Sequence, residues 1–316
     1  MRKTSFHPGP GMHALAAAMV LAISLAGCGH SNNGNRGVDG PVTSETPVVH
    51  QTGNAAAGQT VFRFETFGNE NFFTDAMRLQ QGIVAAGVTP IDALTLGLSV
   101  DIDALDTATQ QAIAAELRTD LSPANAPLLN NPATTVALIN ANAVIGIVAK
   151  DSNGNGTIDV ANGDKTGASC ALCHTITDQS VFNLPGGGSI GKRLDGRAVH
   201  NLNFGKLAAT ALNSRAYYPV LQLSLTANGG ATLGRAPTGL TETSTEAEVD
   251  AYLSNPNFYP IGMFDDTVDG NGDPMKNSPL LRTDLAAPWG TEGAIARLAV
   301  AKSRRDSAHV IATNLA

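Results

Sequence analysis

Two cysteines and a histidine form the most chemically specific pattern in the sequence. Cys170 and Cys173 are separated by two residues, and His174 follows directly. Residues three positions apart share one face of a helix, so both thiols can meet one edge of a porphyrin while the next imidazole reaches its iron. This C-x-x-C-H spacing is typical of covalent haem attachment. We therefore predict one haem c, bonded to Cys170 and Cys173, with His174 as an iron ligand.

Zinc binding and thiol–disulfide exchange are the alternatives for a C-x-x-C pattern. A zinc site would need two further thiolate or imidazole ligands, and the one remaining cysteine in the sequence, Cys28, belongs to the N-terminal segment. A thiol–disulfide pair of the thioredoxin kind would come with a βαβ pattern, which the surrounding sequence does not show. Haem attachment is therefore the favoured prediction.

An iron bound by His174 has a second axial position opposite the imidazole. The methionines and histidines that could fill it after the N-terminal signal are Met77, Met263, Met275, His30, His50, His200 and His309. Met263 lies in an irregular Pro-Ile-Gly-Met-Phe turn, whereas Met77 belongs to an apolar helical stripe that is typical of a core. We predict Met263 as the sixth ligand, with His200 or an open position as the alternatives. A methionine ligand would raise the reduction potential relative to two histidines.

The N-terminus has the pattern of a bacterial lipoprotein signal at residues 1–27. A positively charged start at Arg2 and Lys3 precedes an apolar stretch at residues 14–26, and small residues lead to Cys28. Cys28 would then carry lipid and tether the protein to a membrane surface. A plain signal peptide with a different cleavage site is the alternative. The apolar stretch is shorter than the roughly 18 residues that a spanning helix needs.

Composition divides the rest of the chain into three parts. Residues 28–54 contain scarcely any large apolar side chain, so we predict a flexible tether. Folded structure should begin near Ala55, with a helical N-terminal region at residues 55–150. Residues 151–316 should form a haem domain that is cytochrome c-like and helical. The predicted fold class is thus mainly α, with long irregular loops.

Local signals mark two of the expected helices. Asn131 followed by Pro132 is a helix cap with proline at the first helical position. Thr245 and Glu248 have the spacing of a capping box at the start of another helix. Residues 183–196 are so rich in glycine that we expect no regular structure there, only a loop that could lie against the porphyrin. Within that stretch, Arg193 could pair with a haem propionate or lie in solvent.

An acidic, glycine-containing segment at residues 151–162 permits two interpretations. Its alternating Asp and Asn side chains match most of an EF-hand calcium loop, although Asn162 replaces the glutamate expected at the twelfth position. The alternative, which we favour, is a β-hairpin that joins strands at residues 144–148 and 157–160. Residues 265–273 form a second acidic loop with the same ambiguity. Ca²⁺ is therefore a further candidate cofactor.

Charge limits the classes of partner. The formal net charge is −7, and neither a basic stripe for nucleic acid nor a polybasic membrane patch is present. An acidic electron carrier would be steered toward a redox partner with a basic face. The predicted location is the periplasmic side of a bacterial membrane, reached by the lipid anchor. Gly29, at the position where an inner-membrane retention signal often has aspartate, favours the outer membrane.

Several segments together resemble a known family. They are Cys170-Ala-Leu-Cys-His174, Gly191-Lys-Arg-Leu-Asp-Gly196, Phe62-Arg-Phe-Glu-Thr-Phe-Gly68, and Pro279-Leu-Leu-Arg282 with Ala287-Pro-Trp289 and Gly293. Over residues 55–298 the chain resembles the large periplasmic cytochromes of the di-haem peroxidase-like group. The resemblance implies a mostly helical fold and two haems, whereas this sequence has one C-x-x-C-H motif.

Three functions follow as expectations. The first is an electron-carrying c-type cytochrome in which no side chain acts as an acid, base or nucleophile. The second is a peroxidase-like enzyme with an open iron position, assisted by an acid such as Glu70 or Asp195. The third is a surface binding module in which the haem is structural. The single haem motif favours the electron carrier over the enzyme.

Overall fold

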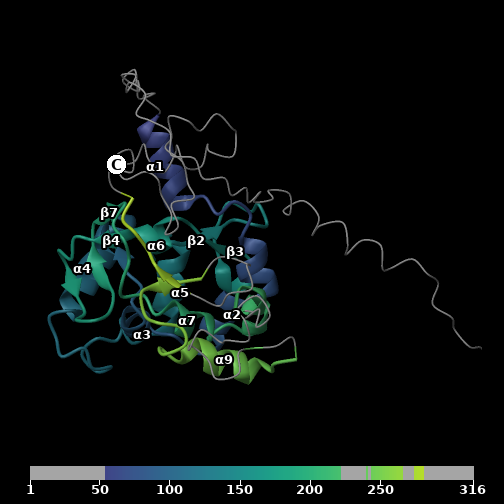
Figure 1. Ribbon diagram of the computed structural model, residues 1–316. Coiled ribbons are helices and arrows are strands. Elements are labelled where there is room, and N and C mark those ends of the chain that lie inside the picture. Colours follow the sequence, from purple (N-terminus) through teal and green to yellow (C-terminus); the bar gives the residue numbers. More distant parts are fainter. Residues whose placement is uncertain (1–53, 222–239, 241–242, 266–273, 281–316) are drawn as a thin grey trace, which may run out of the picture. The chain divides into compact units, whose positions relative to one another are not determined.

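The computed structural model describes residues 54–221, 240, 243–265 and 274–280, all of which belong to one compact unit that runs from His50 to Ala316 (Figure 1). The predicted signal, the lipid site Cys28, nearly all of the tether and most of the second acidic loop lie outside these residues. None of the helices in the described ranges is both long and apolar enough to cross a bilayer.

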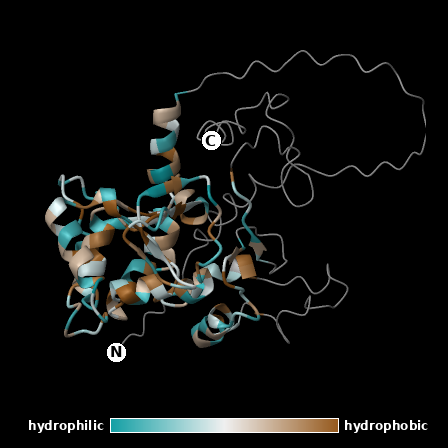
Figure 2. Cartoon of the chain, turned by 90° about the vertical axis from the view of Figure 1, so that its left-hand side faces the viewer, coloured by the Kyte–Doolittle hydropathy of each residue, from teal (hydrophilic) through white to brown (hydrophobic). Residues whose placement is uncertain are grey.

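Helices supply the larger part of the regular structure. The α-helices are α1 (Ala55–Phe64), α2 (Leu79–Ala85), α3 (Pro90–Thr95), α4 (Thr107–Glu116), α5 (Pro132–Asn140), α6 (Ala171–His174), α7 (Phe204–Ala208), α8 (Tyr218–Leu221) and α9 (Glu246–Ser254). A π-helix, η1 (Asn71–Ala76), and 3₁₀ turns η2 (Ile102–Ala104), η3 (Val160–Asn162) and η4 (Ser214–Tyr217) complete them. In Figure 2 the helices carry both brown and teal segments, as expected where one face packs on a core.

The predicted helix starts are confirmed. The first described helix, α1, begins at Ala55, and the side chain of Asn54 caps it by accepting the N–H of Ala57. Asn131 caps α5 with proline at its first position, and the capping box of Thr245 opens α9. These caps satisfy backbone N–H groups that have no partner inside the helix.

Nine short strands within the described residues form four small sheets. They are β1 (Val100–Asp101), β2 (Ile147–Lys150), β3 (Lys165–Ala168), β4 (Thr175–Thr177), β5 (Phe182–Asn183), β6 (Ser189–Gly191), β7 (Arg193–Asp195), β8 (Met263–Phe264) and β9 (Met275–Lys276). The sheets are β1-β6-β5, β2-β3, β4-β7 and β8-β9. β1 and β6 are parallel, with Val100 opposite Ile190, and the other pairs are antiparallel.

The prediction of a mainly α fold is wrong for the described residues, which are 40% helical and 14% strand. The glycine-rich stretch at residues 183–196 accounts for part of the error, because it contains β6 and β7. Gly191 lies inside β6, where a Cβ atom would come within 2.2 Å of the Asp178 carboxylate. Here glycine permits a close approach between neighbouring chain segments and does not mark an irregular loop.

The hairpin predicted around residues 151–162 exists, but its second strand was misplaced. β2 pairs with β3, with Lys150 opposite Lys165, so residues 157–160 belong to the connection and not to a strand. Residues 157–160 include three β-branched residues, Thr157, Ile158 and Val160, as a strand often does. The segment that pairs with β2, however, is the later one, β3. Pairing was decided by tertiary contacts and not by local propensity.

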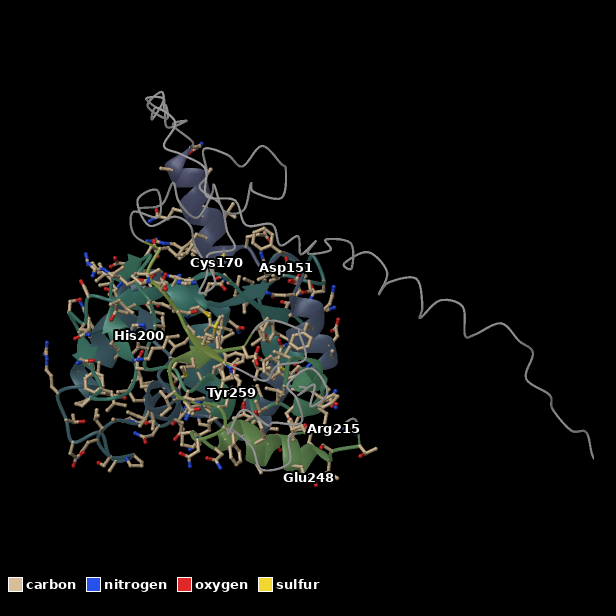
Figure 3. All side chains as sticks on the ribbon, in the orientation of Figure 1. Asp151, Cys170, His200, Arg215, Glu248 and Tyr259 are labelled. Carbon is tan, nitrogen blue, oxygen red and sulfur yellow. The ribbon has the colours of Figure 1, made fainter. Side chains whose placement is uncertain are left out.

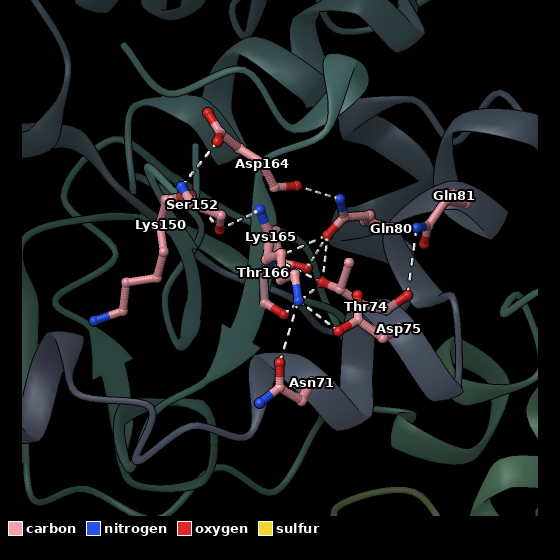
Figure 4. A network of polar contacts seen from close by, with 10 residues as sticks. All are labelled: Asn71, Thr74, Asp75, Gln80, Gln81, Lys150, Ser152, Asp164, Lys165 and Thr166. Carbon is pink, nitrogen blue, oxygen red and sulfur yellow. Dashed lines mark hydrogen bonds and ion pairs between the residues drawn. The ribbon is translucent and has the colours of Figure 1, made fainter. Parts of the chain in front are cut away.

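A buried polar network fixes β3 against η1 and α2 (Figure 4). Gln80 is 4% exposed; its Oε1 accepts from the Thr166 N–H at 2.9 Å and from the Thr74 hydroxyl at 2.8 Å. Its Nε2 donates to the carbonyls of Asp164 at 2.6 Å and of Val160 at 3.2 Å. The Gln80 side chain thus holds the Val160, Asp164 and Thr166 backbone groups, in the segment that leads into the C-x-x-C-H motif.

The main hydrophobic core extends from α2 to α9 and includes Met77, which has 0% exposure, so its predicted core role is confirmed. An aromatic cluster occupies one part of this core. Its members are Phe204, Tyr217, Tyr259 and Phe264, with ring centroids between 5.6 and 6.5 Å apart. Cys173 packs against the same core from the motif side.

Candidate functional site

The C-x-x-C-H motif forms a single helical turn between two strands. Cys170 precedes α6, and its carbonyl accepts the N–H of Cys173 at 3.3 Å and of His174 at 3.1 Å. β3 ends just before the turn and β4 begins just after it. The structure therefore contains the helical turn that the spacing of the two cysteines requires.

Two contacts hold this turn in place. Gly146, at φ 83°, lies so close that a Cβ atom on it would come within 2.1 Å of the Leu172 Cα. Ser169 donates its N–H to the carbonyl of Gly146 at 3.0 Å and its hydroxyl to the carbonyl of Arg63 at 2.8 Å. Helix α1 and the residue before β2 are thus both bonded to Ser169. Figure 3 shows its neighbour Cys170 close to the lower end of α1.

The two thiols have different surroundings. Cys170 is exposed, whereas Cys173 is half-buried against the core. Desolvation by the surrounding chain raises the pKa of the Cys170 thiol even though part of the residue reaches solvent. Cysteines of C-x-x-C redox pairs use a lowered pKa, so this direction disfavours the thiol–disulfide interpretation.

Tyr259, from the aromatic cluster, belongs to the core against which Cys173 packs. Tyr259 is fully buried, and its burial raises the pKa of the phenol, with a smaller contribution from the nearby Cys173 thiol. Its hydroxyl accepts the N–H of Asp265 at 3.0 Å and lies 3.2 Å from the hydroxyl of Tyr217. Because its polar end has these partners, Tyr259 stays neutral within the core against which Cys173 packs.

Met263 and His200 lie on adjoining backbone segments. Gly262, directly before Met263, has φ 72°, and a Cβ on it would come within 2.1 Å of the His200 carbonyl oxygen. The N–H of Gly262 donates to the carbonyl of Leu202 at 2.8 Å. Met263 is half-buried and His200 is exposed. Both predicted candidates for the sixth ligand therefore occupy the same region.

Two hydrogen bonds connect this region to the motif. The carbonyl of Cys173 accepts the N–H of Val199 at 3.0 Å and the side-chain amide of Asn277 at 3.2 Å. The structure therefore brings Cys173, His200 and the segment of Met263 together. Of the other candidates, Met77 is buried in the core and Met275 is 47% exposed, while His30, His50 and His309 lie outside the described residues.

The expected role of Arg193 at a propionate is not what the structure shows, and Arg193 is not solvated either. Its side chain is 2% exposed, donates to Asp101 at 2.6 Å and to the Asn142 carbonyl at 3.0 Å, and lies 5.1 Å from the centre of the Phe64 ring. It is a structural arginine that joins β7 to β1. No local pattern could have revealed Asp101 as its partner.

The two acids expected to assist an enzyme are engaged in structural contacts. Asp195 forms an ion pair with Arg63 at 2.7 Å and accepts from the Thr175 hydroxyl at 3.1 Å, which joins α1 to β7 and β4. Glu70 accepts the hydroxyl of Thr66 at 2.6 Å. Asp195 therefore has a structural role between α1, β4 and β7.

The first candidate calcium loop is the connection between β2 and β3. The Asp151 carboxylate accepts three backbone N–H groups from residues 154–156, at 2.7 to 3.1 Å. Asp164 is buried and accepts the N–H groups of Ser152 at 2.9 Å and Asp159 at 2.8 Å. The Asp159 N–H holds the pKa of Asp164 below its usual value. The loop closes through its own hydrogen bonds, and calcium binding stays a prediction.

A cavity of about 260 Å³ lies beside the motif segment. Its lining includes Leu172, Thr175 and Ile176 from the motif segment, together with Ser99, Ser189 and His200. Pockets for drug-sized ligands measure roughly 300–1,000 Å³, and none of Cys170, Cys173 and His174 lines this one. The cavity is therefore not the place for a porphyrin.

The donor set itself fits a covalently attached haem. One helical turn carries the exposed thiol of Cys170, the half-buried thiol of Cys173 and the imidazole of His174. The thioether of Met263 and the imidazole of His200 lie on segments that are hydrogen-bonded to this turn. Across the described ranges, no group of three or more His, Cys, Asp or Glu side chains could hold a bare metal ion. The described part is thus a mixed helix–strand unit built around a C-x-x-C-H turn.

Comparison with protein-family models, curated proteins and solved structures gives no match to this chain.

Proposed function

We propose that the protein is a c-type cytochrome that carries electrons with one covalently bound haem. The observation that carries the proposal is the C-x-x-C-H helical turn, with an accessible Cys170 and with the segments of Met263 and His200 hydrogen-bonded to it through Cys173. A bound haem would supply one-electron iron chemistry.

Each of the chain's groups has a distinct part in this function. Cys170 and Cys173 anchor the haem, His174 binds the iron on one side, and Met263 is the proposed ligand on the other. Tyr259 and its aromatic neighbours exclude water beside Cys173, because the cluster is buried and its hydroxyl groups are satisfied internally. A dry site with a thioether ligand favours reduced iron and so a raised potential.

Electron transfer is favoured over peroxide turnover. A peroxidase needs an open iron position and an acid that can donate a proton. Asp195 is held in an ion pair with Arg63, and two candidate ligands lie on segments fastened to the motif. The peroxidase-like function, which the family resemblance suggested, remains the alternative.

The remaining elements of the proposal come from the sequence. Lipid on Cys28 would hold the protein at the periplasmic side of a bacterial membrane, and the net charge of −7 suits a redox partner with a basic face. No nucleic acid is expected among the partners.

Mass spectrometry of the exported protein tests the proposal. We expect the wild-type chain to carry one added haem mass on the peptide that contains residues 170–174. Cys170→Ser with Cys173→Ser should abolish it, whereas Cys28→Ser should remove lipid and leave haem in place. A wild-type chain without added haem mass would overturn the proposal.

Spectra separate the two functions. A carrier should show a sharp low-spin α band when reduced, and a weak near-infrared sulfur-to-iron band when oxidised that disappears in Met263→Ala. High-spin iron that binds cyanide quickly and turns over peroxide would instead establish the peroxidase-like alternative.

A further inference from the structure

The carbonyl of Cys173 is the point at which three parts of the described chain meet. It lies near the end of the one-turn helix α6, where carbonyl groups lack partners inside the helix. Val199 donates its backbone N–H to this carbonyl at 3.0 Å, and Asn277 donates its side-chain amide at 3.2 Å. The second of these bonds depends on a side chain, so a substitution can remove it.

Asn277 also contacts the other elements of the region. Its backbone carbonyl lies 3.2 Å from Nε2 of His200. The residue before it, Lys276, lies directly opposite Met263 in the β8-β9 pair. Asn277 is therefore half-buried at the junction between the motif turn, the segment of His200 and the strand that bears Met263.

A pair of strands as short as β8 and β9 needs such an anchor. Isolated two-stranded hairpins are marginally stable in water, and β8 and β9 have two residues each. Other hydrogen bonds also hold this segment to the rest of the unit. The Gly262 N–H donates to the Leu202 carbonyl, the Asp265 N–H to the Tyr259 hydroxyl and the Leu280 N–H to the Gly196 carbonyl, in addition to the contact of the Asn277 carbonyl with His200 and that of the Asp265 carbonyl with the Tyr217 hydroxyl. The side chain of Asn277 bonds the segment directly to the motif turn, at the Cys173 carbonyl.

We infer that Asn277 is a positioning residue that fastens the β8-β9 pair, and with it Met263, to the haem-bearing turn. The inference deepens the proposed function and rests on it for the role of Met263. The positioning itself, in which the side-chain amide of Asn277 holds β8 and β9 against Cys173, does not depend on whether haem is bound.

Hydrogen exchange tests the positioning itself without reference to haem. In Asn277→Ala and in Asn277→Asp, which keeps the shape but lacks the donor, the backbone amides of β8 and β9 should exchange about 2–10-fold faster at neutral pH, the change that one hydrogen bond produces. Asn125→Ala is the control, because Asn125 is exposed and its amide bonds only within its own loop, to Asp120. Unchanged exchange in both Asn277 variants would overturn the inference.

Spectroscopy of the haem-loaded chain tests the consequence. Both Asn277 variants should keep the added haem mass but lose part of the sulfur-to-iron band and show a lower midpoint potential, while Asn125→Ala matches the wild type. A full band and an unchanged potential in both Asn277 variants would show that Asn277 does not position Met263. Absence of haem from the wild type would refute the proposed function instead, and the exchange measurement would still decide the fastening.

Discussion

Replacing Gln80 with methionine is the sharpest test of how the motif segment is supported. Methionine has nearly the same shape but can neither accept nor donate strongly. The change removes the bonds of Oε1 to the hydroxyls of Thr74 and Thr166 and to the Thr166 N–H, together with those of Nε2 to the carbonyls of Val160 and Asp164. All of them are buried, so water cannot replace the lost partners.

The expected cost follows from the groups left without a partner. The Thr166 N–H still donates to the Thr74 hydroxyl at 2.9 Å. The Val160 and Asp164 carbonyls and the Thr166 hydroxyl each lose their hydrogen bond to Gln80. At about 1–3 kcal/mol for each buried polar group left unsatisfied, and with partial relaxation, Gln80→Met should lower the free energy of unfolding by about 3–6 kcal/mol. For a unit of this size that corresponds to a fall in Tm of roughly 6–24 °C.

Gln81→Met is the matched control. Gln81 is half-buried and makes one bond, from its amide to the Thr74 carbonyl at 3.3 Å, while its Oε1 is buried without a hydrogen-bond partner. Its replacement should change the free energy of unfolding by less than about 1 kcal/mol. Urea titrations followed by circular dichroism would measure both variants. Equal stabilities for the Gln80 and Gln81 variants would refute the reasoning from the network.

Three further predictions concern the same part of the chain. Gly146→Ala should destabilise the protein more than Gly154→Ala in the same titrations: both have positive φ, which costs about 1–3 kcal/mol, but a Cβ also meets the Leu172 backbone at Gly146 and open space at Gly154. Because the pKa of Asp164 is lowered in the folded state, its carboxylate stabilises the fold above the unfolded pKa of about 3.9. Asp164→Asn should therefore be less stable than the wild type at pH 7. The difference in the free energy of unfolding should shrink as the pH falls through the folded pKa. Chelator should leave Tm unchanged if residues 151–164 are held by their own hydrogen bonds, whereas a rise in Tm with added calcium would establish a calcium site.

The helix starts were predictable because their signals are local. Asn131 before Pro132 and the capping box of Thr245 specify a helix start through residues at most three positions apart. The short strands gave no such signal. β6 and β7 have three residues each and contain or adjoin glycine, so neither alternation nor β-propensity marks them. Their pairing partners, β1 and β4, decide their conformation.

The motif was predictable for the same reason, and its surroundings were not. Cys170, Cys173 and His174 form a contiguous pattern, whereas the bond from Asn277 to the Cys173 carbonyl joins residues 104 positions apart. An asparagine in a polar segment carries no sign of such a partner. The pairing of Arg193 with Asp101 was hidden in the same way, 92 positions away.

The connectivity of the strands sets an order of assembly around the thiols. β2 and β3 are close in the sequence, with Lys150 opposite Lys165, and β3 leads directly into the segment of the two cysteines. β1 pairs with β6, which lies much later in the sequence, with Val100 opposite Ile190. Because closing a long loop costs more entropy and slows folding, the hairpin should form early. The turn that carries Cys170 and Cys173 would then take its place on a hairpin that is already formed, before the core against which Cys173 packs is complete.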